Sequence, residues 1–242
     1  MLLVVGQPEI FDLAHEYRFP EASRHRLRYC GYIHHKKSTH RHINRKNSPN
    51  QFSVLVAAGG GGDGFPLIQT YLEGLQRQLS GLQLHSTVIT GPEMPADQQA
   101  QLREQATGIP NLELLEFSPQ MEEQLAGADL VICMGGYNTL CETVVNRKRT
   151  IVIPRTQPVE EQWIRAKHFA NRGLLEAIHP DNLSPETLMQ TIDRNLTHLS
   201  DDGLPDVLDF NGLERMHYWV NQLLEKQQTE TLKEETLSCM HY

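Results

Sequence analysis

The sequence predicts an α/β fold with a doubly wound parallel sheet, and two observations support this prediction. Beginning at residue 52, apolar runs of strand length alternate with amphipathic stretches of helical length, a pattern that forms a parallel sheet covered on both faces. Glycine clusters directly follow two of the apolar runs, as they do where a strand of such a sheet turns into a helix. The length of 242 residues corresponds to one large domain, or to one domain with a fragment of another.

The expected elements follow one another in a regular order. Strands are predicted at residues 52–58, 84–90, 112–117, 129–134 and 150–154, where short apolar runs stand between turn formers. Helices are predicted at residues 65–79, 96–106, 118–127, 139–147 and 158–173. Ser118 before Pro119 is expected to cap the third of these helices, and Gly173 to close the fifth.

The flanking segments differ from this regular part. Residues 1–33 hold one short apolar run and no sustained period, and a stretch rich in His, Arg and Lys follows before the turn formers NSPN. We therefore expect residues 1–50 to be the remnant of another domain with a basic linker, and residues 51–226 to form the main domain. A last helix is expected from Leu213 to Glu225, and a polar tail at residues 227–242.

Composition excludes several classes of function. The net charge is −8, from 22 basic and 30 acidic residues, which argues against broad nucleic-acid binding. No apolar run approaches the roughly 20 residues of a membrane helix, and the N-terminus lacks the pattern of a secretory signal. Cys30, Cys133, Cys141 and Cys239 show no paired spacing, so a reducing cytoplasm is expected.

The basic stretch offers two further candidates. His34, His35, His40 and His42 form the nearest metal candidate, but they lack rigid ligand spacing, so we expect no metal site. Lys36, Lys37, Arg41, Arg45 and Lys46 form a local patch for an anionic lipid headgroup and thus for peripheral membrane contact. A solvated linker is the favoured alternative for both sets.

Two glycine clusters are the strongest local features. AAGGGGDGF follows the first strand, and GGYNTLCE, with Gly135 and Gly136, follows the fourth. Glycines let a backbone approach a ligand closely, and the helix that follows offers N–H groups and a positive dipole end to phosphate. Both turns fall on the carboxyl edge of a parallel sheet, so they can converge on one diphosphate at a switch point. The alternative is that each cluster only makes a tight turn.

A dinucleotide site is a weaker alternative for the first cluster. Gly59, Gly61 and Gly64 satisfy the spacing G-x-G-x-x-G. That motif also needs an acidic residue at the end of the second strand, whereas here Glu93 comes only after a proline. This weakens the interpretation as a dinucleotide-dependent oxidoreductase.

Polar residues on the next two helices suit hydroxyl groups. Glu142 lies four residues after Asn138, on the same helix face, where a carboxylate can accept two hydrogen bonds from a ribose diol. Glu160, Glu161 and Gln162 begin the following helix at the same sheet edge and suit the hydroxyls of a sugar. Acidic residues that simply favour a helix N-terminus remain the alternative in both places.

The stretch from Phe52 to about Leu188 resembles the C-terminal, nucleotide-sugar-binding domain of GT-B glycosyltransferases, a Rossmann-like domain. The nearest resemblance is to family 28, the group that includes the bacterial N-acetylglucosaminyltransferase of peptidoglycan-precursor synthesis. AAGGGGDG matches the glycine loop of that family, GGYNTLCE its small-residue turn and ribose-binding glutamate, and PVEEQ its donor-sugar loop. The three motifs occur in the order of the family.

The resemblance implies a role for particular residues. It places beside the donor diphosphate Gly60, Gly61, Gly62, Gly135, Gly136 and Asn138. Glu142 would bind the ribose, and Glu161 with Gln162 would bind the donor sugar. Phe117 and Met121, in FSPQM, fall at the nucleobase pocket, with core packing as the alternative for Met121.

The resemblance also implies an activity: a sugar, from UDP-N-acetylglucosamine or a related UDP-hexose, passes to an acceptor hydroxyl without metal or cofactor. The acceptor is unknown and would be lipid-linked or a small molecule. The acceptor domain of such enzymes is nearly absent here, and RYCGYI resembles its last strand and exit segment. We therefore assign no catalytic residue and expect a separate acceptor-domain chain or a homo-oligomer. The alternative of another class is a non-catalytic nucleotide-sugar-binding subunit.

Overall fold

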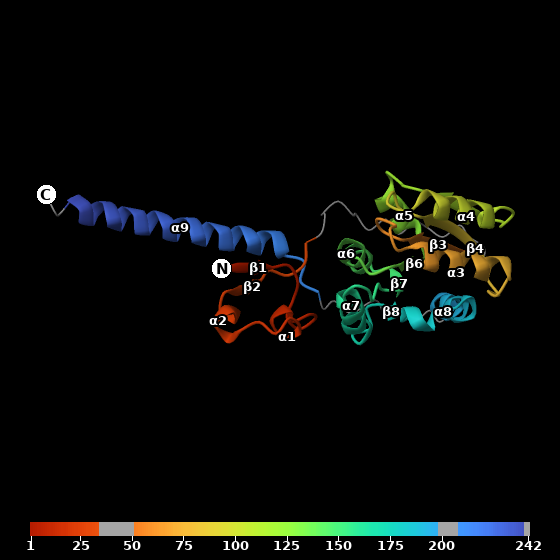
Figure 1. Cartoon of the computed structure of the whole chain (residues 1–242), viewed down its shortest axis with the longest axis horizontal. Coiled ribbons are helices and arrows are strands. Elements are labelled where there is room, and N and C mark those ends of the chain that lie inside the picture. The colour runs from red at the N-terminus through yellow and green to blue at the C-terminus, as the bar shows by residue number, and fades with distance from the viewer. Residues whose placement is uncertain (34–50, 198–207, 240–242) are drawn as a thin grey trace. The chain divides into compact units, whose positions relative to one another are not determined.

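A computed structural model describes residues 1–33, 51–197 and 208–239 of the chain (Figure 1). The described residues fall into two units. One consists of residues 51–197, and the other combines residues 1–33 with residues 208–239.

The first unit is built on a six-stranded sheet whose strands are all parallel. Its strands are β3 (Gln51–Ala57), β4 (Gln83–Ile89), β5 (Leu112–Leu115), β6 (Leu130–Cys133), β7 (Arg149–Val152) and β8 (Glu176–Ala177). Its helices are α3 (Phe65–Gln76), α4 (Ala96–Ala106), α5 (Met121–Gly127), α6 (Tyr137–Val145), α7 (Glu161–Ala170) and α8 (Pro185–Thr197), with a 3-10 turn at Pro180–Asn182. The predicted α/β class with a parallel sheet is confirmed.

Helices cover both faces of this sheet (Figure 1). Along β3 the side chains alternate between the faces: Val54 and Val56 pack with buried residues of α3, α4 and α8. Leu55 points to the other face and packs against Leu125 of α5. Both faces of the strand are therefore buried, which is why β3 is a continuous apolar run rather than an alternating one.

The order of the strands is β5-β4-β3-β6-β7-β8. The chain therefore runs from β3 to β4 and β5 on one side, and then returns to β6 on the other side of β3. The gap between the carboxyl ends of β3 and β6 is a topological switch point, where ligands bind in open sheets of this kind. Both predicted glycine clusters follow these two strands.

The second unit is small. Strand β1 (Leu2–Val4) pairs in parallel with β2 (Leu27–Tyr29), and the short helices α1 (Leu13–Glu16) and α2 (Glu21–Arg24) lie between them in sequence. The long helix α9 (Gly212–Cys239) completes the unit. Its start is fixed by backbone hydrogen bonds, from the Tyr32 N–H to the Asp209 carbonyl at 2.7 Å and from the Gly212 N–H to the Tyr32 carbonyl at 3.0 Å.

The structure differs from the expected boundaries at the C-terminus. Sequence analysis assigns residues up to 226 to the sheet domain and expects a polar tail from residue 227. In the structure, residues 208–239 belong with residues 1–33, and α9 continues to Cys239. The backbone contacts of Asp209 and Gly212 with Tyr32 decide this assignment, and a helical sequence pattern cannot reveal such contacts.

Three smaller differences concern the sheet unit. Helix α5 begins at Met121 rather than at Ser118, because the Ser118 hydroxyl accepts the Gln120 N–H at 3.2 Å within a turn before the helix. Strand β8 and helix α8 were not predicted. A two-residue strand leaves too little periodicity to detect.

Candidate functional site

The helices α3 to α7 all begin at the carboxyl edge of the sheet without a side-chain cap, and three of them, α3, α6 and α7, begin next to the predicted site residues. The capping positions of α3, α6 and α7 are Gly64, Gly136 and Glu160, and none of these residues makes a side-chain capping hydrogen bond. The first N–H groups of a helix have no partner within the helix. These three N-termini therefore direct N–H groups without an intrahelical partner, and positive dipole ends, to this edge of the sheet.

The glycine loop after β3 packs closely on the loop after β4. The Ala58 N–H donates to the Ile89 carbonyl at 3.1 Å, and the Glu93 N–H donates to the Gly60 carbonyl at 2.7 Å. Gly61 has φ +97°, and a Cβ there would overlap the Thr90 carbonyl oxygen. Gly61 is therefore needed for the packing of the two loops, whatever ligand they bind.

Other predicted glycines face open space. A Cβ on Gly62 would have only the Glu93 carboxylate near it, at 4.0 Å, and a Cβ on Gly136 would have nothing within 4 Å. Gly60 is intermediate, because a Cβ there would lie 2.7 Å from the end of the Glu93 side chain. Packing thus gives no reason for glycine at positions 62 and 136, so these positions leave room for a ligand.

The second glycine turn adjoins the end of β7. Gly135 is buried with φ +81°, and its Cβ would lie 2.9 Å from Val152 Cγ1. Helix α6 begins directly after this turn, with Asn138 exposed in its first turn. Glu142 follows one turn later and is half-buried. The sheet thus brings Gly135, Gly136 and Asn138 to the same edge as the first glycine loop.

The two predicted nucleobase residues have different surroundings. Phe117, in the loop after β5, is 67% exposed and is accessible for stacking. Met121 begins α5 and packs against the apolar cluster that contains Leu125. Core packing, the alternative that sequence analysis left open for Met121, therefore applies to this residue.

The predicted sugar-binding pair is engaged within the protein. Glu161 forms an ion pair with Arg165 one turn later in α7. The Gln162 side-chain oxygen accepts the Arg155 N–H at 3.0 Å and so holds the loop that leads from β7 into α7. Both side chains stand at the start of α7 on the carboxyl edge.

An ion pair that sequence analysis missed connects two of the loops. Arg155, after β7, lies 3.5 Å from Asp63 in the glycine loop after β3. Because β6 lies between β3 and β7 in the sheet, this ion pair extends past the end of β6, where the second glycine turn begins. The only local signal was a basic residue directly after a strand.

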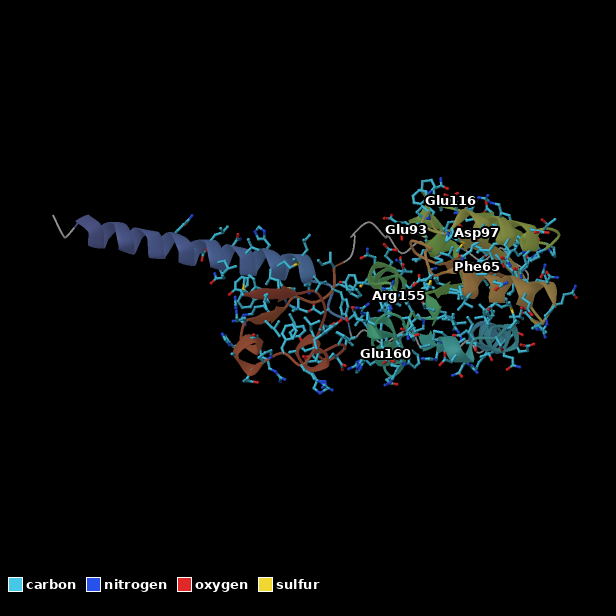
Figure 2. All side chains as sticks on the ribbon, viewed as in Figure 1. Phe65, Glu93, Asp97, Glu116, Arg155 and Glu160 are labelled. Carbon is cyan, nitrogen blue, oxygen red and sulfur yellow. The ribbon has the colours of Figure 1, made fainter. Side chains whose placement is uncertain are left out.

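Acidic side chains also lie at this edge of the sheet. Figure 2 labels Glu93, Glu116, Arg155 and Glu160 on the loops that follow β4, β5 and β7. Glu93 and Glu160 are exposed, and Glu116 lies 3.7 Å from Arg103. Arg155 is the basic side chain among these four, so an anionic ligand at this edge would meet Arg155 together with the backbone N–H groups of the helix N-termini.

No group of three or more His, Cys, Asp or Glu side chains suited to a metal ion occurs among the residues that the structure describes. The histidine candidates His34, His35, His40 and His42 lie outside those residues, as do the basic patch residues Lys36, Lys37, Arg41, Arg45 and Lys46. No described helix is long and apolar enough to cross a membrane.

Solved glycosyltransferases share the fold of this chain. MurG of Acinetobacter baumannii matches with a TM-score of 0.52 at 22% identity, over 61% of this chain and 42% of that chain. The calicheamicin glycosyltransferase CalG4 gives a TM-score of 0.53 at 17% identity, over 81% of this chain and 45% of that chain. The sheet unit therefore has the fold of a GT-B glycosyltransferase domain, with glycine loops on both sides of its switch point.

Sequence comparison identifies the family. The model of the glycosyltransferase family 28 C-terminal domain matches residues 54–201, which is more than half of the chain. The chain belongs to this family, and the resemblance drawn from the glycine motifs is confirmed.

Two curated relatives illustrate the match. The UDP-N-acetylglucosamine--N-acetylmuramyl-(pentapeptide) pyrophosphoryl-undecaprenol N-acetylglucosamine transferase of Haemophilus influenzae is 32% identical over 89 residues, which are 37% of this chain and 25% of that protein. An uncharacterized glycosyltransferase of Methanopyrus kandleri is 28% identical over 164 residues, which are 67% of this chain and 42% of that protein. The chain thus matches less than half the length of either relative.

Proposed function

We propose that this chain supplies the donor-binding part of a glycosyltransferase and holds a UDP-sugar for transfer of the sugar to an acceptor hydroxyl. One observation carries the proposal: glycine loops stand on both sides of the switch point, with Gly62 and Gly136 facing open space beside uncapped helices. The family supports a glycosyltransferase. The name of the Haemophilus relative specifies a UDP-N-acetylglucosamine donor, so we propose this sugar or a related UDP-hexose.

In this proposal, main-chain groups rather than side chains provide most of the stabilisation of the leaving diphosphate. N–H groups of the glycine loops and the dipoles of α6 and α7 stabilise the negative charge that develops on the departing diphosphate. Glu142 binds the ribose, Phe117 stacks on the base, and Glu161 with Gln162 contacts the sugar. We expect neither a metal nor a cofactor. The acceptor, lipid-linked or a small molecule, is bound by a separate acceptor-domain chain or a second copy.

A non-catalytic donor-binding subunit is the second candidate, because every residue assigned above contacts the donor and none is assigned to catalysis. The two candidates differ in turnover: a complete enzyme releases UDP from donor and acceptor, whereas a subunit only binds. The oxidoreductase alternative keeps its G-x-G-x-x-G spacing, because close packing of the glycines is part of that motif as well. A Cβ on Gly61 would overlap the Thr90 carbonyl, and a Cβ on Gly64 would overlap Ala58.

Calorimetric titration of the purified chain with UDP, UDP-N-acetylglucosamine and NAD, each without metal, tests the proposal. Saturable binding of the two uridine nucleotides, and none of NAD, is the expected result. Binding of NAD alone, or of none of the three, would contradict the proposed donor site.

Glu142→Ala is the sharpest single test of the ribose contact. Loss of a charge-assisted hydrogen bond should weaken UDP binding by about 1–3 kcal/mol. Glu104→Ala is the matched control, because Glu104 is exposed near the C-terminal end of α4, away from the carboxyl edge. Equal affinities of the two folded variants would remove Glu142 from the site.

We further propose a cytoplasmic location with peripheral membrane contact. The support is the set of free, buried thiols at Cys30, Cys133 and Cys141, which suits a reducing compartment. Sedimentation of the chain with anionic vesicles, and its release by salt, would test the membrane contact.

A further inference from the structure

The ion pair between Arg155 and Asp63 connects the loop after β7 to the first glycine loop, which the proposed function assigns to the diphosphate. Gly135 packs against the residues just before Arg155, since its Cβ would lie 3.8 Å from Pro154 Cβ. The Ile153 N–H also donates to the Cys133 carbonyl at 2.9 Å. Arg155 therefore leaves the sheet beside the second glycine turn, and its side chain reaches the first glycine loop at Asp63.

The backbone of Arg155 is held independently of its side chain. The Gln162 side-chain oxygen accepts the Arg155 N–H at 3.0 Å, and Pro154 before it is buried. The guanidinium is therefore attached to a fixed point of the sheet edge. Replacing only the side chain leaves this hydrogen bond in place.

The ion pair itself is weakly held. The side chains of Arg155 and Asp63 are 44% and 46% exposed, and their charged atoms are 3.5 Å apart. Exposed ion pairs of this kind contribute little to stability, because water screens both charges. A guanidinium, by contrast, binds phosphate through two parallel, charge-assisted hydrogen bonds. A phosphate can therefore displace Asp63 at small cost.

We propose that Arg155 is the side-chain contact of the donor's distal phosphate, and that Asp63 holds its guanidinium in place while the site is empty. This inference rests on the proposed function. The proposed base contact, Phe117, follows β5, and the proposed sugar contact, Gln162, begins the helix after β7. Arg155 also follows β7, so it stands at the sugar end of the ligand, next to the distal phosphate.

The test compares UDP with UMP, which lacks the distal phosphate, by calorimetry on the full chain. Arg155→Ala should weaken UDP binding about 10- to 100-fold and leave UMP binding within about twofold of the wild type. Arg155→Lys keeps the charge but not the planar fork, so it should restore part of the UDP affinity. Asp63→Asn removes the competing carboxylate and should tighten UDP binding up to about fivefold.

Arg77→Ala is the matched control. Arg77 is 45% exposed and pairs with Glu73 and Glu186, near the C-terminal end of α3 and away from the carboxyl edge. It should bind UDP as the wild type does. Unchanged UDP affinity in Arg155→Ala, or an equal loss for UDP and UMP, would overturn the inference while the proposed function stands. A wild-type chain that binds neither nucleotide would overturn both.

Discussion

Gly61 and Gly62 are neighbours in the loop after β3, but only Gly61 is required by the packing of that loop. Gly61 adopts φ +97° and lies against the Thr90 carbonyl, whereas a side chain at Gly62 would meet only the Glu93 carboxylate, at 4.0 Å. Gly61→Ala should therefore lower the free energy of unfolding by about 1–3 kcal/mol, and Gly62→Ala by no more than about 0.5 kcal/mol. Urea denaturation of the two variants measures the difference. Equal stabilities would show that the two loops do not pack as described.

Substitution of Gly136 is expected to change UDP binding without changing the stability of the fold. A Cβ there would touch nothing within 4 Å, so Gly136→Ala should fold with wild-type stability. Its methyl group would nevertheless stand where α6 begins, in the path of a bound diphosphate, and should weaken UDP binding about tenfold or more. Thermal melting and calorimetry on the same sample check both halves. Wild-type UDP affinity would place the ligand elsewhere on the edge.

The cysteines near the site are inert. Burial raises the pKa of Cys133 to about 11 and that of Cys141 to about 12. At pH 8 both thiols are protonated and shielded, and only the thiolate reacts with a disulfide reagent. We expect neither to react in the native chain and both to react in denaturant. Rapid native labelling of either, located by mass spectrometry, would contradict this packing.

Individual residues also show which features of the site the sequence alone cannot predict. The glycine motifs are found where the sequence predicts them, at the carboxyl ends of β3 and β6, because their spacing relative to the strands is local. The same motifs could not separate Gly61, which is required by packing, from Gly62, which is not. Nor could they pair Asp63 with Arg155, because these residues meet only once β3, β6 and β7 lie side by side.

At the scale of elements, Lys148 ties α5 to the start of β7. Its ammonium donates to the carbonyls of Ala126 at 2.6 Å and Ala128 at 3.0 Å. Lys148→Met leaves both carbonyls without this donor and should lower the free energy of unfolding by about 1–3 kcal/mol. Urea denaturation measures the loss, and a loss below about 0.5 kcal/mol would contradict a structural role.

The pH dependence of this variant has a definite sign. Burial lowers the pKa of Lys148, although Asp129 acts in the opposite direction. The unfolded chain then binds more protons than the folded chain between the lowered pKa and the ordinary value, so the wild type gains stability as pH rises through that interval. The stability gap between wild type and Lys148→Met should therefore widen at alkaline pH. A gap that narrows there would contradict the lowered pKa.

Helices and strands with a strong hydrophobic periodicity are predicted well from the sequence. Very short elements, and elements whose ends depend on local turns or on distant residues, are not. The apolar run of β3 and the amphipathic α3 give clear patterns, and both are present. The two-residue β8 has no detectable period. Ser118 resembled a helix cap but serves a turn, because Pro119 and Gln120 still lie outside the helix.

At the scale of the whole molecule, every residue of the proposed site belongs to one unit. The glycine loops, α6, Phe117 and the start of α7 all lie within residues 51–197. A fragment of these residues has its own core on both faces of the sheet and should bind UDP within about threefold of the full chain. Circular dichroism and calorimetry check its folding and binding. A folded fragment that does not bind UDP would show that residues outside it complete the site.

Binding of the diphosphate largely by main-chain N–H groups, as proposed, would allow the preference for a particular nucleotide sugar to change without loss of diphosphate binding. Because main-chain N–H groups and the single side chain of Arg155 are proposed to bind the diphosphate, substitutions at the base end of the ligand should leave diphosphate binding unchanged. Phe117 is 67% exposed at that end, whereas the Gln162 side chain also holds the Arg155 N–H, so of these two residues Phe117 can be exchanged independently. A library randomised at position 117 should yield variants with new base preferences that still recognise pyrophosphate, so the same sheet edge would bind different nucleotide sugars.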